Sequence, residues 1–175
     1  MILEPLDPLE PLVLTDGALS GAVLTEITAL YASNREFQRL SGEFPDPDDI
    51  RVGQVAKSLA DELAHPHAEV LLARSAGRLV GIVITLAHHP DPAEPDPWIG
   101  LLMVDASLHR SGFGRELATL VEARFRQAGR QAVRLAVLEN NPKALRFWTA
   151  LGYLVTGHSE DRELHRPCAV LRKRL

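Results

Sequence analysis

The sequence contains almost no cysteine. Cys168 is the single cysteine among 175 residues, so an internal disulfide is excluded, and no C-x-x-C pair or cysteine–histidine cluster indicates a metal site. A chain without disulfides suits a reducing compartment, and we therefore expect a cytoplasmic protein.

Long apolar runs and an excess of positive charge are missing as well. No run approaches the roughly 18 apolar residues needed to span a bilayer, and the opening segment MILEPLDPLEPLVL lacks the basic region of a secretory signal. The formal net charge of −4 argues against a surface that binds polyanions. We therefore expect neither a membrane nor a nucleic acid as a partner, and the basic end LRKRL fits a solvated strand end.

The apolar residues that are present predict one α/β domain over residues 1–175. At 46% hydrophobic residues, a chain of this length builds one ordinary core. A turn at Ala76 and Gly77 predicts a hairpin. The predicted strands cover residues 12–14, 70–73, 79–86, 98–104, 131–138, 153–158 and 167–175, and the predicted helices cover 15–34, 48–65, 112–128 and 143–151.

Two glycines stand where a strand gives way to a helix. The segment 107–125, SLHRSGFGRELATLVEARF, passes from Gly112 and Gly114 into apolar residues spaced by three and four. N–H groups at a helix N-terminus are unpaired and favour an anion, and glycine leaves room for its close approach. Alone, this pattern fits either a simple turn or a phosphate-binding loop. The Lys-Ser/Thr pair of a P-loop and the G-x-G-x-x-G of a dinucleotide fold are both absent.

A second motif further along the chain favours the phosphate loop. LENNPKALRFWTALGY, residues 138–153, places Asn141 and Pro142 at the cap and first position of a helix that stops at Gly152. Together the two motifs resemble motifs A and B of the GNAT superfamily of N-acetyltransferases, over about residues 70–170. The resemblance implies an α/β fold, with a central mixed twisted β-sheet flanked by helices on both faces. It also implies acetyl-CoA (coenzyme A) as cofactor.

The resemblance assigns candidate residues to this cofactor. It implies that the backbones of Leu102, Met103 and Val104 face the acetyl-pantetheine arm. Gly100 independently indicates a bulge or a close backbone approach in the same strand. The implied contacts around the pyrophosphate and arm are His109, Arg110, Ser111, Gly112, Phe113, Gly114, Arg115, Asn141 and Trp148. From the residues alone, the two arginines also read as surface charges, and Asn141 as a plain helix N-cap.

The sequence departs from the family pattern at three positions. His109 stands where Gln or Arg is usual, Trp148 where many members have a proton-donating tyrosine, and Ala136 where some relatives have a glutamate base. An indole N–H is not acidic enough to protonate a thiolate. We name Asp96 and Tyr153 as catalytic candidates, Asp96 as a proton acceptor and Tyr153 as the phenol nearest the second motif.

Direct attack of an amine on the thioester needs little acid catalysis, because a thiol with a pKa of about 8.5 leaves readily. We therefore expect acetyl transfer to a primary amine of a small molecule or peptide, with Asp105, His88 and His89 as alternatives to Asp96. The alternative function is an acyl-CoA-binding sensor or interaction module with little or no catalysis. Whether the chain forms a homodimer stays open. The acidic residues expected to attract a cationic acceptor are Glu36, Glu43, Asp46, Asp48 and Asp49.

Overall fold

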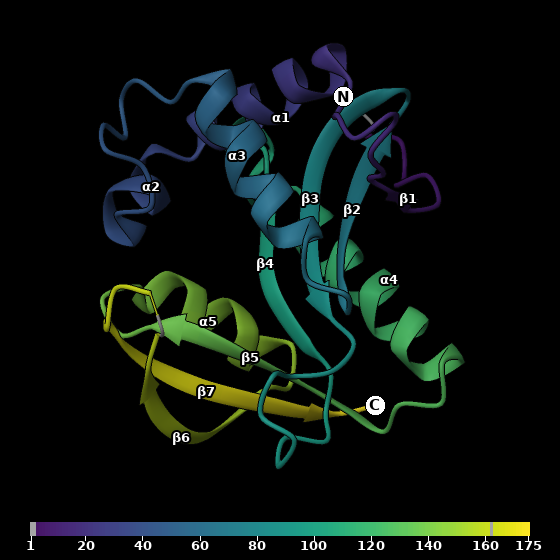
Figure 1. Cartoon of the computed structure of the whole chain (residues 1–175). Coiled ribbons are helices and arrows are strands. Elements are labelled where there is room, and N and C mark those ends of the chain that lie inside the picture. Colours follow the sequence, from purple (N-terminus) through teal and green to yellow (C-terminus); the bar gives the residue numbers. More distant parts are fainter. Residues whose placement is uncertain (1–2, 162) are drawn as a thin grey trace.

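The strands form one mixed sheet. The computed structural model describes residues 3–161 and 163–175. Within these residues the strand order is β1-β2-β3-β4-β5-β7-β6 (Figure 1), and only the β4–β5 pair is parallel. The expected mixed sheet is therefore confirmed. Its members are β1 (Glu10–Pro11), β2 (Ala68–Ser75), β3 (Arg78–Leu86), β4 (Trp98–Val104), β5 (Ala132–Leu138), β6 (Leu154–Glu160) and β7 (Pro167–Arg174).

Helices cover both faces of this sheet, as expected. The helices are α1 (Gly21–Ser33), α2 (Arg35–Ser41), α3 (Val52–Leu63), α4 (Phe113–Gln127) and α5 (Pro142–Ala150), with a short 3-10 turn, η1, at Ala106–Leu108. Along β3, Ile82 and Ile84 pack with α1 and α3, whereas Val83 between them packs with α4 and α5. This alternation gives two apolar layers, one on each face. Figure 1 shows α3 in front of β2 and β3, and α4 behind them. None of the helices in the described part of the chain is both long and apolar enough to cross a membrane.

The start of the chain differs from the sequence-based prediction. The first strand pairs at Glu10–Pro11 rather than at residues 12–14, and residues 15–20 form a turn rather than the first part of a helix. Asp16 and Gly17 have φ angles of 52° and 77°, a conformation that no helix accepts. Helix α2 was not predicted. It is only seven residues long and ends at Gly42, whose φ is 64°.

Local signals placed the later elements correctly. Ala76 and Gly77 form the β2–β3 turn with φ angles of 49° and 79°, as a two-residue hairpin requires. The carboxamide oxygen of Asn141 accepts a hydrogen bond from the N–H of Ala144 at 3.1 Å, which caps α5 as predicted. Gly129, just beyond α4, has φ of 77°. Each of these features depends on residues only a few positions apart.

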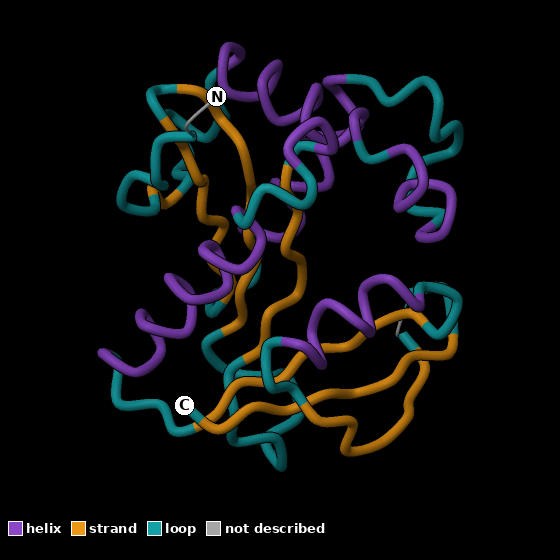
Figure 2. The backbone as a smooth tube through the Cα atoms, turned by 180° about the vertical axis from the view of Figure 1, so that it is seen from behind, coloured by secondary structure: helices purple, strands orange, loops and turns teal. Residues whose placement is uncertain are grey.

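Strands β4 and β5 separate soon after they meet. Their pairing is confined to Trp98 with Arg134 and Ile99 with Leu135. The β3–β4 register shifts at the same point, because Ile84 faces Leu101 while the next residue of β3 faces Ile99, so Gly100 is the bulged residue. The bulge expected at Gly100 is thereby confirmed. Figures 1 and 2 show β2–β4 and β5–β7 running in clearly different directions beyond this point.

Candidate functional site

A cleft of about 1380 Å³ lies where β4 and β5 separate. Its walls come from α1, α2, α3, β3, β4, the loop before α4 and the start of α4, β5, α5 and the loop between β6 and β7. The cleft thus brings together segments that are far apart in the sequence. Most of the residues expected to contact the cofactor line it, namely Leu102, Met103, Val104, His109, Arg110, Gly112, Gly114, Arg115, Asn141 and Trp148.

Ser111 and Phe113 lie beside this lining rather than in it. The Ser111 hydroxyl donates a hydrogen bond to the carbonyl of Leu108, within the loop. The Phe113 ring is buried in the core beneath α4. The side chains of these two residues therefore support the loop and the helix.

The start of α4 presents unpaired N–H groups. The first hydrogen bond of the helix joins the Glu116 N–H to the Gly112 carbonyl at 3.0 Å, so the N–H groups just before Glu116 have no partner within the helix. Gly112 has φ of 94°, and a Cβ built there would meet nothing within 4 Å. Arg110 and Arg115 line the same end of the cleft. This combination of unpaired donors, positive charge and open space suits an anion.

A glycine is needed at position 114 for a different reason. A Cβ at this position would lie 3.1 Å from Cε2 of the Phe147 ring, on α5. Phe147 itself lines the cleft and packs edge-on against Trp148, with ring centroids 4.9 Å apart. Gly114 therefore lets α4 and α5 approach each other beside the cleft.

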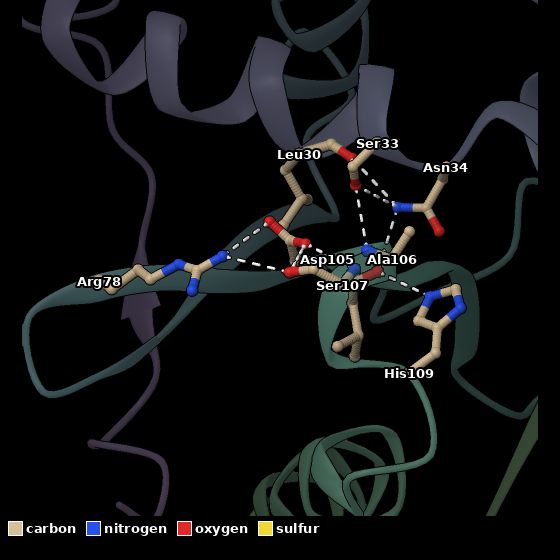
Figure 3. A network of polar contacts seen from close by, with 9 residues as sticks. Leu30, Ser33, Asn34, Arg78, Asp105, Ala106, Ser107 and His109 are labelled. Atoms are coloured by element: carbon tan, nitrogen blue, oxygen red, sulfur yellow. Dashed lines mark hydrogen bonds and ion pairs between the residues drawn. The ribbon is translucent and has the colours of Figure 1, made fainter. Parts of the chain in front are cut away.

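Hydrogen bonds tie the end of β4 to α1 (Figure 3). The Asn34 carboxamide N–H donates to the carbonyls of Leu30 and Val104 at 3.0 and 3.1 Å. The Val104 carbonyl also accepts from Nε2 of His109 at 3.0 Å, and the Ser33 hydroxyl accepts from the Ala106 N–H at 3.1 Å. His109 thus braces the loop that carries the α4 glycines.

Asp105 extends this network on the exposed side. Its carboxylate accepts from the Ser107 N–H and hydroxyl at 2.9 and 2.6 Å, and from Arg78 at 3.2 Å (Figure 3). Burial alone would raise the pKa of Asp105, but the contacts with Ser107 and Arg78 hold it below its usual value. Asp105 does not line the cleft, and neither do His88 and His89.

The two catalytic candidates lie outside the cleft lining. The Asp96 carboxylate accepts from Nε of Arg134 and Nε of Arg172, each at 2.9 Å. Burial opposes ionisation of Asp96, but the two arginines lower its pKa overall. The fully buried Tyr153 donates to the Glu122 carboxylate at 2.9 Å. The structure therefore gives each residue a partner within the fold, and a catalytic role for either stays a prediction.

Carboxylates gather at the other end of the cleft. Glu36 and Glu43 line it as expected, with Glu36 paired to Lys143 and Glu43 accepting from Ser58, both at 2.8 Å. The remaining acidic residues expected there, Asp46, Asp48 and Asp49, are not part of the lining. Sequence reasoning missed many polar lining residues, which no motif marks, among them Tyr31, Glu62, Asp161 and Glu163.

Glu62 has an unusual environment among these carboxylates. Its side chain is half-buried near the end of α3. Burial, followed by the charges of Glu43 and Glu163, raises its pKa above the usual glutamate value. The cleft therefore has a basic end at the start of α4 and an acidic end between α3 and the β6–β7 loop.

Comparison with known proteins agrees with this arrangement. The sequence profile of the Acetyltransferase (GNAT) family matches residues 27–153. A mycothiol acetyltransferase of Thermomonospora curvata is 38% identical over 86 residues, which cover 49% of this chain and 28% of that relative. The matched segment thus spans well under half of that protein's length.

Solved structures share the fold. An acetyltransferase from Thermus thermophilus superposes with a TM-score of 0.76 at 19% identity, covering 100% of both chains. A spermidine N-acetyltransferase chimera from Vibrio cholerae and hSSAT gives a TM-score of 0.64 at 16% identity, covering 96% of both chains. The family match favours an acetyltransferase over the alternative of an acyl-CoA-binding sensor or interaction module.

Proposed function

The chain belongs to the GNAT family of acetyltransferases, and on that premise we propose that it transfers acetyl from acetyl-CoA to a primary amine by direct attack. The single observation that carries this proposal is the cleft between β4 and β5, which joins a basic, donor-rich end to an acidic end. The two ends suit a polyanionic donor and a cationic acceptor, respectively. We propose that residues 1–175 act as one acetyltransferase domain.

We assign the donor to the end formed by the α4 glycines. The open space at Gly112 and the unpaired N–H groups before Glu116 fit a pyrophosphate. Arg110 and Arg115 would add charge-assisted hydrogen bonds, and Ser111 and Phe113 only backbone groups. The arm would lie along Leu102, Met103 and Val104, where β4 is paired with β3 but no longer with β5, with Asn141 and Trp148 on the facing helix.

When bound, acetyl-CoA supplies an activated acetyl group as a thioester. The protein's contribution is mainly to position the two reactants and to keep them apart from bulk water. Asn34 and His109 hold the end of β4 in place for this purpose. Trp148 offers no acidic proton, but a thiol with a pKa of about 8.5 leaves without much assistance.

The acceptor is proposed to be a small-molecule or peptide amine. Glu43, Glu62 and Glu163 line the acidic end, and they would attract an ammonium group. One neighbour in fold acts, by its name, on spermidine, an amine of this kind. A cytoplasmic location stays a prediction, and whether the chain forms a homodimer stays open.

Ligand-dependent melting tests the donor assignment. Acetyl-CoA at about 100 times its dissociation constant should stabilise the fold by about 2.7 kcal/mol, whereas NAD and ATP should not. Release of free thiol from acetyl-CoA, measured with a panel of amines, then tests transfer. Absence of any melting shift with saturating acetyl-CoA would contradict the donor site, and absence of thiol release with every amine would contradict transfer.

A further inference from the structure

The acidic end of the cleft contains a tyrosine that the donor site does not use. Tyr31, on α1, is 2% exposed and lines the cleft, and its ring packs against Phe44 at 6.1 Å between centroids. Its hydroxyl has no hydrogen-bond partner within residues 3–161 and 163–175. The hydroxyl oxygen is not fully enclosed, so it can form a hydrogen bond with a ligand that enters the cleft.

Glu62 lines the same cleft from α3, which packs against α1 in one apolar cluster. Burial, then the charges of Glu43 and Glu62, raises the pKa of the Tyr31 phenol. No described residue forms a hydrogen bond or ion pair with the Glu62 carboxylate. Three other cleft carboxylates already have partners, namely Glu36 with Lys143, Glu43 with Ser58 and Asp161 with Arg166, whereas the Glu163 carboxylate forms no hydrogen bond or ion pair with a described residue.

We propose that the Tyr31 hydroxyl and the Glu62 carboxylate hold the acceptor ammonium group, and that Glu62 takes a proton from it. This inference rests on the proposed amine acetylation and names its acceptor subsite. Transfer of one proton from R–NH₃⁺ to Glu62 leaves R–NH₂. The nitrogen lone pair then forms a bond to the thioester carbonyl carbon, and the C–S bond breaks with its electrons on sulfur. A second nitrogen proton goes to that sulfur, giving the thiol and the amide, and Glu62 returns its proton to solvent.

The charges around Glu62 also define the class of acceptor. Glu43 faces it from the α2–α3 loop and Glu163 from the β6–β7 loop, while Asp61 and His65 lie on or just beyond its own helix. The Arg166 charge in this region is paired with Asp161. Because the charges of described residues that act on Glu62 are mainly negative, a second cationic group on the acceptor is favoured and a carboxylate is disfavoured. We therefore expect 1,4-diaminobutane to be a much better acceptor than 4-aminobutanoate, a matched pair of similar length.

Kinetics on the full chain test the proton transfer. In the native protein, kcat for 1,4-diaminobutane should rise with pH through the raised pKa of Glu62 and then level off. Glu62→Gln should lower kcat by about 10²–10⁴-fold near neutral pH, and its rate should keep rising toward the free-amine pKa of about 10.4. Glu69→Gln makes the same substitution at an exposed carboxylate outside the cleft lining, and it should leave both kcat and the pH profile unchanged.

Binding without acetyl-CoA provides a second readout. In calorimetry with 1,4-diaminobutane alone, Tyr31→Phe should weaken binding by about tenfold or more, with no loss of stability because its hydroxyl has no partner among the described residues. Unchanged diamine affinity in Tyr31→Phe, or an unchanged pH profile in Glu62→Gln, overturns the subsite. If the diamine binds in a manner that depends on Glu62 but no thiol is released, the subsite stands and the proposed transfer fails.

Discussion

Replacing Tyr153 with phenylalanine removes one hydroxyl from the core and keeps the ring that packs beside Trp148. The hydroxyl donates to Glu122 at 2.9 Å, and the two residues are 0% and 4% exposed. Removing one donor from a buried carboxylate lowers the free energy of unfolding by about 1–3 kcal/mol. Lys173 Nζ, at 2.9 and 3.3 Å from the two oxygens of the same carboxylate, still partners it, so we expect the lower part of that range. At about 2–4 °C per kcal/mol for a chain of this size, Tm should fall by about 2–6 °C.

The same substitution should change the rate of acetyl transfer less than about tenfold. Burial and the charge of Glu122 raise the pKa of the Tyr153 phenol and so make it a weaker acid, and the side chain does not line the cleft. Loss of a true general acid typically costs about 10²–10⁴-fold. Differential scanning fluorimetry gives Tm, and thiol release from acetyl-CoA at fixed amine concentration and pH gives the rate. A fall of about a hundredfold in a folded variant that still binds acetyl-CoA would refute this reasoning and identify Tyr153 as the acid.

Three further substitutions and one control probe the site and its frame. Gly112→Val forces a branched side chain into a backbone φ of 94° at the proposed phosphate loop. Calorimetry should show that acetyl-CoA binding is lost, while the free energy of unfolding falls by only about 1–3 kcal/mol. Normal binding in this variant would place the phosphates elsewhere. Gly114→Val should weaken binding by displacing Phe147, 3.1 Å from the new Cβ, whereas Gly53→Val, where a Cβ meets nothing within 4 Å, should leave binding intact. Asp96→Asn should lower the free energy of unfolding by about 1–3 kcal/mol at pH 7, because Asp96 lies beside the end at which β4 and β5 are paired. Because the pKa of Asp96 is held below its usual value, its contribution to stability is lost as pH falls through that lowered pKa, so urea unfolding should show the difference from the native protein shrinking in acid.

The features that the sequence predicted well are those set by a few neighbouring residues. Asn141 followed by Pro142 specifies a helix start, Ala76 with Gly77 specifies a hairpin turn, and Gly100 in an apolar strand specifies a bulge. The prediction of a helix over residues 15–20 was wrong, and the cause is again local. The apolar residues of that segment suited a helix, but Gly17 adopted a left-handed turn instead.

The sequence by itself determined the family, the mixed sheet and the loop that the donor is proposed to use, because motif spacing and hydrophobic periodicity are written within short stretches of chain. Only the tertiary structure decided which polar groups meet at the acidic end of the cleft. Tyr31, Glu62 and Glu163 come from three separated segments, which the sheet brings to one opening. The tertiary structure also gave Asp96 two arginine partners and buried Tyr153 against Glu122. The physical reason is that backbone preferences act over a few residues, whereas burial, hydrogen-bond partners and pKa values depend on long-range packing.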